Sequence, residues 1–117
     1  MIARFIAALL LLSSAVAARA DTDWEVVKTL PHDKKSFTEG FFIADGLLYE
    51  STGLVGKSDI RVMSLTDGKI LKRQAIDPKM FGEGIAPWKD RIISLTWQTG
   101  KGYVWKRSSL KLVKSFS

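Results

Sequence analysis

Residues 37–40 read F-T-E-G and residues 81–84 read F-G-E-G, so Phe, Glu and Gly recur at the same places, 44 residues apart. The same offset superposes further apolar, polar and turn positions of the two halves: Leu48 with Ile92, Thr52 with Thr96, Gly56 with Gly100, and Ile60 with Val104. No gap is needed until the last hairpin, which we expect to be two residues shorter in the second copy. A period near 44 residues with four short strands per unit is typical of β-propeller blades.

The secondary structure expected from the sequence is entirely β. No stretch keeps a helical period over three turns, whereas short apolar or alternating runs recur between turn dipeptides. Asp-Gly at 45–46 and at 67–68 is a strong hairpin signal. The predicted strands are residues 24–30, 40–43, 47–51, 60–64, 70–76, 84–87, 91–97, 102–106 and 111–116. The predicted fold class is therefore all-β, a β-propeller of which the chain holds two blades, with repeats near 37–80 and 81–117.

The number of blades raises a physical problem, because a propeller closes as a ring of roughly four to eight blades. Two blades alone leave apolar faces and strand edges open. The sequence also stays β-like from Leu112 to its last residue. We therefore expect residues 21–117 to be the N-terminal part of a longer propeller domain. The alternative is a ring assembled from several two-blade chains.

Residues 1–20 have the organisation of a secretory signal peptide. Arg4 precedes an apolar run at 5–12, and small residues then lead to A-R-A at 18–20. The apolar run is too short to span a membrane as a helix. We expect cleavage after Ala20, with Ala17 as the alternative site and an uncleaved N-terminal anchor as the alternative interpretation. The mature protein is accordingly predicted to be secreted or periplasmic, with no membrane association after cleavage.

The charge distribution argues against a nucleic-acid-binding surface. The formal net charge is +6, and it falls to +4 when Arg4 and Arg19 leave with the signal peptide. The basic residues are scattered in pairs near turns, whereas a nucleic-acid protein clusters them on one face. Cysteine is absent, so disulfides cannot supplement the small core. We expect no nucleic-acid partner, and a monomer for the full-length protein.

Metal chemistry and serine hydrolysis have little support in the sequence. The chain has one histidine and no cysteine, so the usual zinc ligand sets are missing. His32 lies in L-P-H-D at 30–33 and is predicted to hydrogen bond in a turn. No G-x-S-x-G elbow occurs. We therefore predict no metal-ligating residue and no cofactor required for the chemistry.

Two glutamates beside aromatic residues are the strongest candidates for chemistry. Phe37 precedes Glu39 by two residues and Phe81 precedes Glu83 by two, so each ring is expected on the same strand face as its carboxylate. Loss of solvation, and a second like charge in a central channel, raise the pKa of a carboxyl group. Such a group suits acid–base catalysis near neutral pH. The alternative is that repeated residues are architectural and only pack the blades.

Trp97 breaks the repeat, because its counterpart in the first copy is Gly53. It ends a predicted strand within T-W-Q at 96–98, where a rim loop is expected to begin. Since the repeat does not require a tryptophan there, Trp97 is predicted to belong to a site. Gly40 and Gly84 follow the two glutamates. Because glycine lacks Cβ, they are expected to admit a substrate or a neighbouring backbone.

Four linked motifs resemble the plant-type and bacterial glutaminyl-peptide cyclotransferases, also called glutamine cyclotransferases. They are P-H-D-x-x-x-F-T-E-G at 31–40, L-Y-E-S-T-G-L-x-G-x-S at 48–58, F-G-E-G-I at 81–85 and L-T-W at 95–97. Their order and spacing match over nearly the entire mature chain. The resemblance implies a five-bladed β-propeller, longer than this chain, with the active site at one mouth of its central channel.

The resemblance also implies an activity, the conversion of the N-terminal glutamine of a peptide to pyroglutamate with release of ammonia, by an acyltransferase of the aminoacyltransferase type. It places the proton-transfer residue at Glu83 and the pocket aromatics at Phe37, Phe81 and Trp97. The position of Glu39 is commonly glutamine in the family, so this chain adds a charge among its substrate-binding residues. A structural metal ion in the channel is compatible with the family, and no residue here is identified as its ligand.

Two other functions stay open at this point. A propeller also serves as a secreted, non-catalytic binding module, because a fold does not fix a function. The chain by itself is also compatible with an inactive truncated fragment, since the donors for an oxyanion are expected in further blades. The partner expected for the enzyme is a peptide or protein with an N-terminal glutamine, whereas a binding module would release no ammonia.

Overall fold

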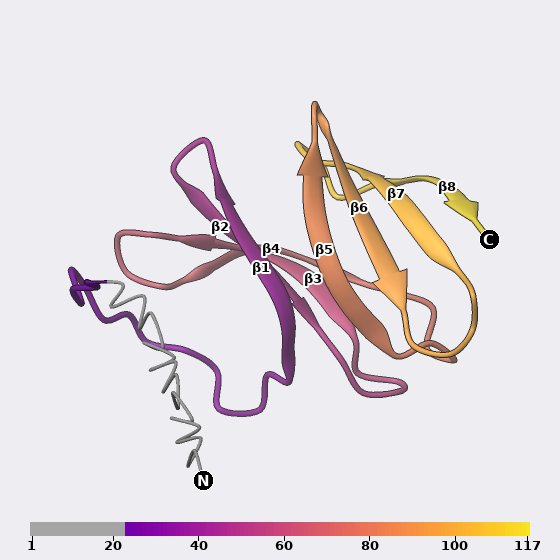
Figure 1. Ribbon diagram of the computed structural model, residues 1–117, viewed down its shortest axis with the longest axis horizontal. Helices are drawn as coiled ribbons and strands as arrows, with labels where there is room; N and C mark the ends of the chain where they lie inside the picture. Colours follow the sequence, from indigo (N-terminus) through magenta and orange to yellow (C-terminus); the bar gives the residue numbers. More distant parts are fainter. Residues whose placement is uncertain (1–22) are drawn as a thin grey trace, which may run out of the picture.

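The computed structural model describes residues 23–117, which form two four-stranded antiparallel β-sheets (Figure 1). The predicted signal peptide at 1–20 lies outside the described residues. Each sheet is a meander, because its strands are neighbours in chain order. The strands of the first sheet are β1 (Thr38–Ala44), β2 (Leu47–Thr52), β3 (Asp59–Ser64) and β4 (Ile70–Ala75). Those of the second are β5 (Gly82–Trp88), β6 (Arg91–Thr96), β7 (Gly102–Lys106) and β8 (Leu112–Phe116).

The predicted all-β class and its two blade-like sheets are confirmed, and one predicted strand is wrong. Eight of the predicted segments correspond to β1–β8. The remaining predicted segment, residues 24–30, is not a strand, because it pairs with no strand of the described region. Its side chains Trp24 and Val27 are exposed. Within residues 23–117 no helix has the length and apolar character needed to cross a membrane.

Backbone conformation repeats between the two sheets as the sequence does. Four pairs of equivalent residues have positive φ: Asp45 (51°) with Lys89 (55°), Leu54 (80°) with Gln98 (57°), Gly56 (76°) with Gly100 (65°), and Gly68 (74°) with Leu110 (58°). Residues with a side chain rarely adopt this conformation. Its recurrence at matching turns therefore indicates one supersecondary unit built twice.

The two-residue shortening of the second copy is not in the last hairpin, as the sequence alignment had it. Leu48 of β2 pairs with Met63 of β3 in the first sheet, and Ile92 of β6 pairs with Trp105 of β7 in the second. Ile92 is therefore the counterpart of Leu48, and Trp105 is the counterpart of Met63. The offset between the two copies is thus 44 residues at β2 and 42 at β3. Ile60 therefore corresponds to Gly102, not to Val104. The shortening lies in the loop before β7, where Lys101 alone stands in place of residues 57–59.

One apolar core joins the two sheets. Ile60 of the first sheet and Ile92 of the second are fully buried. Phe42 stacks on Tyr49 with ring centroids 4.7 Å apart. The other buried apolar members of this cluster are Val62, Ile76, Met80, Tyr103, Trp105 and Leu110. Because residues of both sheets contribute, each sheet buries one face against the other.

The first strands of the two sheets, β1 and β5, lie against one another, and we call them the inner strands (Figure 1). A Cβ built on Gly40 would be 3.0 Å from Gly84 Cα and 3.0 Å from Ile85 N. Both neighbours are backbone atoms, so little adjustment is available. A Cβ on Gly84, in contrast, would have no atom within 4 Å. The sequence predicted that these glycines admit a substrate or a neighbouring backbone. In the structure Gly40 admits the neighbouring backbone, whereas Gly84 faces open space.

The first prediction tests this contact. Gly40→Ala is expected to lower the free energy of unfolding by about 1–3 kcal/mol, because the added methyl group forces the two inner strands apart. Urea unfolding followed by circular dichroism measures the change. Gly84→Ala is the matched control and is expected to change the stability by less than about 1 kcal/mol. Equal destabilisation by the two replacements would contradict the assigned contact.

Candidate active site

The two motif glutamates each lie at an irregularity of strand pairing at the start of an inner strand. In β1 the register against β2 shifts between Thr38 and Gly40, so that Glu39 is the extra residue. In β5 the register against β6 shifts between Gly82 and Ile85, around Glu83. Such bulges re-aim side chains and are common beside active sites. The strand alternation that we used to orient the glutamates therefore does not hold at these two residues.

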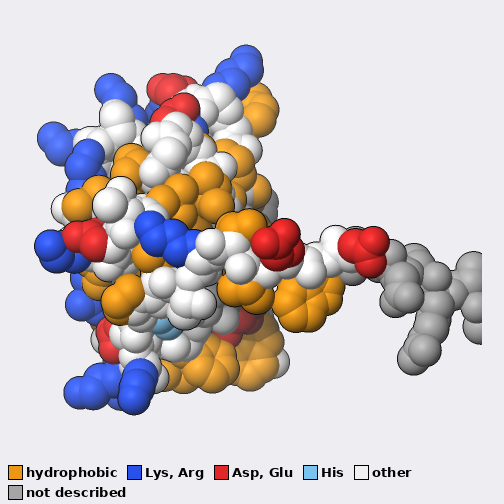
Figure 2. Space-filling model, turned by 90° about the vertical axis from the view of Figure 1, so that its left-hand side faces the viewer, with side chains coloured by type: hydrophobic (Ala, Val, Ile, Leu, Met, Phe, Trp, Pro, Cys, Tyr) orange, Lys and Arg blue, Asp and Glu red, His pale blue; other side chains and the backbone are white. Residues whose placement is uncertain are grey.

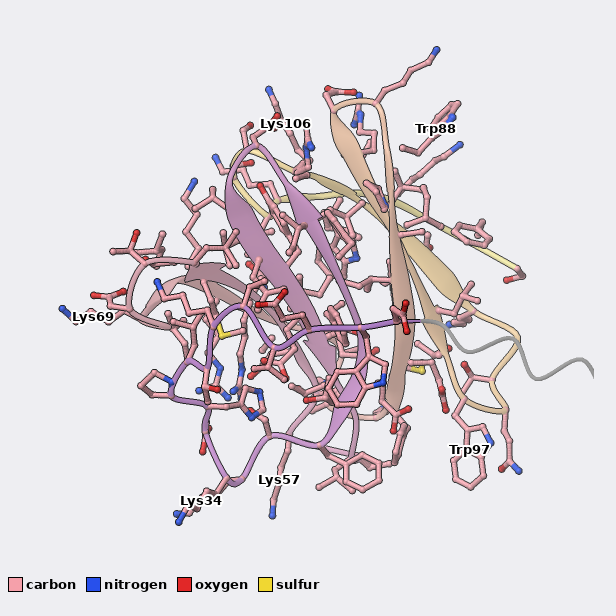
Figure 3. The ribbon with its side chains drawn as sticks, turned by 60° about the vertical axis from the view of Figure 1, so that its left-hand side comes forward. Lys34, Lys57, Lys69, Trp88, Trp97 and Lys106 are labelled. Carbon is pink, nitrogen blue, oxygen red and sulfur yellow. The ribbon has the colours of Figure 1, made fainter. Side chains whose placement is uncertain are left out.

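Three aromatic side chains form a continuous row at this end of the inner strands. The rings of Phe37 and Phe81 meet edge to face, with centroids 6.0 Å apart and an interplanar angle of 85°. Phe81 also meets Trp97 edge to face at 5.5 Å and 65°. Figure 3 shows Trp97 at one end of the second sheet and Trp88 at the other. Phe37 and Trp97 are both about half exposed, at 51% and 53%, so the row is an open apolar wall.

Gly53 and Trp97, the positions at which the repeat breaks, are held by the same backbone hydrogen bond. The Gly53 N–H donates to the Phe37 carbonyl at 2.7 Å, and the Trp97 N–H donates to the Phe81 carbonyl at 3.0 Å. A Cβ on Gly53 would lie 2.4 Å from Phe81 Cε1 and 3.0 Å from Glu39 Cγ. The first copy therefore needs glycine here, because the Phe81 ring occupies that space. The second copy has a side chain at the same place, and it extends the aromatic wall.

The carboxyl groups of Glu39 and Glu83 are neighbours across the two sheets. Burial, followed by the negative charge of Glu83, raises the pKa of Glu39 above its ordinary value of 4.5. The hydroxyl of Ser51 donates to the Glu83 backbone carbonyl at 2.6 Å and ties β5 to β2. We expected a neighbouring like charge to raise the pKa of one of the two carboxyl groups, and this group is Glu39. Its position is commonly glutamine in the family that the motifs resemble.

A pH-dependent stability is expected from this pair. The folded chain holds the Glu39 proton more tightly than the unfolded chain, so ionising Glu39 destabilises the fold above its raised pKa and has no effect well below 4.5. Glu39→Gln should therefore raise the thermal midpoint at neutral pH, and the gain should shrink as the pH falls toward 4. Scanning calorimetry from pH 3.5 to 8 measures it. Glu25→Gln, on an exposed residue, is the control, and an equal gain there would contradict the assignment.

All five residues predicted for the site lie together in the structure. Phe37, Glu39, Phe81, Glu83 and Trp97 surround the junction of the two inner strands. The sequence missed Ser51, which anchors the Glu83 backbone, and it missed both bulges. The glycine after each glutamate was an available signal for a bulge, since glycine in a strand often marks one. No group of three or more potential metal ligands is found within residues 23–117.

The arrangement combines two carboxyl groups with an apolar wall. A carboxylate exchanges a proton with a nearby amine, and a second carboxyl group of raised pKa beside it is able to hold one. The aromatic row can pack against an alkyl or amide side chain while the carboxyl groups meet its polar atoms. The open space beside Gly84 leaves room for a ligand next to Glu83.

Comparisons with known proteins agree with the motifs. The sequence profile of the glutamine cyclotransferase family matches residues 2–117. A glutaminyl-peptide cyclotransferase of Arabidopsis thaliana is 39% identical over 93 residues, which are 79% of this chain and 29% of the relative. The chain thus spans less than a third of that protein's length.

A solved structure supports the fold independently of sequence. The computationally designed Ika4 protein superposes with a TM-score of 0.58 at 11% identity, over 78% of this chain and 53% of that one. At this identity the likeness concerns the arrangement of strands only. The profile match over almost the entire length and the identity to the plant protein decide the family. This chain belongs to the glutamine cyclotransferase family.

Proposed function

We propose that the protein containing this chain is a glutaminyl-peptide cyclotransferase, which converts the N-terminal glutamine of a peptide or protein to pyroglutamate and releases ammonia. The observation that carries the proposal is the placement of Glu83 beside Glu39 and the row of Phe37, Phe81 and Trp97. Family membership supplies the reaction class. The geometry supplies a carboxyl group for proton transfer and an apolar wall for positioning the substrate.

In the proposed reaction the substrate's neutral α-amine attacks its own γ-carboxamide carbon. A C–N bond forms and closes a five-membered ring. Glu83 takes the proton that the attacking amine must lose, and returns it to the departing nitrogen, which leaves as ammonia when the original C–N bond breaks. One carboxylate is enough for both transfers, because the two nitrogens are attached to the same tetrahedral carbon. Acid–base help of this kind contributes about 10²–10⁴ in rate.

The aromatic row acts in this proposal by positioning the substrate. A glutamine side chain cyclises only when it folds back toward its own amine. An apolar wall that packs against the side-chain methylenes favours this folded conformation and lowers the entropic barrier to ring closure. Phe37 and Trp97, both half exposed, are placed to make that contact, and Phe81 bridges them.

The assay is direct. A preparation that contains this chain is incubated with a short peptide beginning with glutamine, and ammonia is measured together with the mass loss of the peptide. Release of one ammonia per pyroglutamate formed is expected, and a peptide beginning with asparagine is the control for non-specific deamidation. Tight binding of the peptide without ammonia would identify a binding module instead. We further propose export of the protein, on the basis of the signal-like sequence at 1–20.

A further inference from the structure

The turn that leads into β1 has the same construction as the turn that leads into β5. In residues 31–37, which we call the entry turn, the Ser36 N–H donates to the Asp33 carbonyl at 2.9 Å. Before β5 the Met80 N–H donates in the same way to the Asp77 carbonyl, also at 2.9 Å. The two turns are therefore equivalent at an offset of 44 residues, and each leads directly into an F-x-E-G motif of the candidate site.

The two turns are anchored by different kinds of side chain. Before β5, Ile76 and Met80 are buried in the apolar core. The entry turn has His32 and Ser36 at the equivalent positions, and Ser36 accepts from the Arg61 guanidinium. Figure 2 shows the histidine, in pale blue, at the surface, and 44% of its side chain is exposed. The entry turn is thus held by hydrogen bonds where its equivalent is held by apolar packing.

Glu50 of β2 connects the entry turn to the start of β1. The residue is 1% exposed. Its Oε1 atom is hydrogen bonded to His32 Nε2 at 2.8 Å and accepts from the Thr38 hydroxyl at 2.5 Å. Its Oε2 atom is buried and has no hydrogen-bond partner within residues 23–117. In the part of the chain that the structure describes, the carboxyl group therefore depends on these two bonds, and we call the three residues the Glu50 network.

A second set of hydrogen bonds fixes the shape of the entry turn without reaching β1. Arg61 of β3 donates from Nη1 to Asp33 Oδ2 at 3.3 Å and to the Ser36 hydroxyl. The Lys35 N–H donates to Asp33 Oδ1 at 2.9 Å. These bonds join the turn to β3 and to itself, whereas the bonds of Glu50 join the turn to the strand that carries the first glutamate of the site.

Thr38 lies directly between two site residues, Phe37 and Glu39. Glu39 is the extra residue of the bulge in β1, so regular strand pairing does not restrain it. On one side of the bulge the Phe37 carbonyl accepts from the Gly53 N–H at 2.7 Å. The bond from Thr38 to Glu50 adds a side-chain restraint at the residue next to the bulge. The Glu50 network therefore acts where the backbone of the site is least restrained by the sheet.

Glu83 is held in a different way. The residue before it is Gly82, which has no side chain to bond and whose N–H donates to Ser58 Oγ at 2.9 Å. The Glu83 carbonyl accepts from the Ser51 hydroxyl at 2.6 Å. Neither bond involves the entry turn. A change in the Glu50 network should therefore displace Glu39 and leave Glu83 in place.

We propose that the Glu50 network positions Phe37 and Glu39 for the substrate, and that His32 and Thr38 are positioning residues of the active site. Side chains of a site keep their geometry when hydrogen bonds around them fix the backbone that carries them. The inference rests on the proposed cyclotransferase activity, in which Phe37 and Glu39 contact the substrate and Glu83 transfers the proton. Loss of the network should accordingly weaken substrate binding more than it slows the chemical step.

Thr38→Val tests the network in the full-length protein that contains this chain, because valine keeps the branched shape and loses only the hydroxyl. KM for a peptide beginning with glutamine should rise about 3–30-fold, while kcat stays within about threefold. Thr38→Ser, which keeps the hydroxyl, should restore KM to within about twofold of the unchanged protein. Thr66→Val makes the same change on an exposed residue and should alter neither constant.

His32 provides a second pair of variants. His32→Leu removes the bond to Glu50 and should raise KM as Thr38→Val does, whereas His32→Gln keeps an N–H donor and should restore it. An unchanged KM in both Thr38→Val and His32→Leu overturns the proposal. A fall in kcat alone also overturns it, since a merely structural role lowers the amount of active protein and leaves KM as it was.

The titration of Glu39 gives a readout that needs no catalysis. Burial and the charge of Glu83 raise the pKa of Glu39, so moving Glu39 away should bring its pKa back toward 4.5 in Thr38→Val and not in Thr66→Val. NMR of the glutamate carboxyl carbons measures it, with Glu39→Gln for assignment. An unchanged pKa in Thr38→Val overturns the positioning, whatever the activity. A lowered pKa in a protein that releases no ammonia supports the positioning and contradicts the proposed function.

Discussion

Glu83→Gln is expected to lower kcat for cyclisation of a glutamine-initiated peptide by about 10²–10⁴-fold. The amide keeps the size of the side chain, so the aromatic wall and the bulge in β5 stay in place. It has no basic oxygen that could take the proton from the attacking amine. KM should change far less than kcat, because the lost interaction belongs to the transition state. Ammonia release measured under saturating peptide gives kcat directly.

Two controls keep this result interpretable. Asp90→Asn makes the same chemical change on an exposed carboxylate, and its activity should equal that of the unchanged protein. Trp97→Ala removes part of the proposed wall and should raise KM, with kcat changed by less than in Glu83→Gln. Activity of Glu83→Gln within about tenfold of the unchanged protein would remove Glu83 from the mechanism.

Asp59→Ala is expected to have the largest effect on stability, with a loss of about 3–5 kcal/mol. The side chain of Asp59 is 1% exposed. It accepts from Arg61 Nε at 2.7 Å, from Thr52 Oγ1 at 3.0 Å, and from Arg73. Burial alone would lower the pKa of Arg61, but the hydrogen bond and charge of Asp59, together with the charges of Glu50 and Asp33, outweigh burial and raise it. Removing Asp59 leaves the Arg61 guanidinium buried without its main counter-charge.

Urea unfolding measures this loss, which should lower the midpoint by more than about 1 M. Asp67→Ala is the comparison, since Asp67 makes a surface ion pair with Lys69 at 3.0 Å and such pairs contribute at most about 1 kcal/mol. If Asp59→Ala does not fold, Asp59→Leu combined with Arg61→Met should restore folding by replacing the buried pair with apolar groups. Equal midpoints for Asp59→Ala and Asp67→Ala would show that the buried network contributes nothing.

The strands and turns of this chain were predictable because they depend on local sequence. Asp45-Gly46 predicted a hairpin, and both residues have positive φ, as a tight turn between two strands requires. The segment 24–30 also contains strand-forming apolar residues, yet it is not a strand. Such a composition shows that a segment is able to pair, whereas the pairing itself depends on a neighbour that the local sequence does not contain.

The candidate site was predictable as a set of residues, and its geometry was not. The repeat and the family motifs singled out Phe37, Glu39, Phe81, Glu83 and Trp97, and these residues do meet in the structure. The orientation of the glutamates depends on bulges that strict alternation excludes. The two-residue gap between the copies was misplaced because apolar residues superpose at an offset of 44 residues and also at an offset of 42. Only the hydrogen-bonded register distinguishes the two offsets.

The sequence by itself determined the repeat, the all-β class, the types of residue at the site and the family. These properties follow from periodicity and motif spacing, which act over a few residues or recur along the chain. The tertiary structure decided that Gly40 touches backbone while Gly84 faces open space, that the pKa of Glu39 is raised, and that Glu50 Oε2 lacks a partner. Each of these depends on which atoms two distant segments bring within a few ångströms, and desolvation, steric contact and charge coupling act only over such distances.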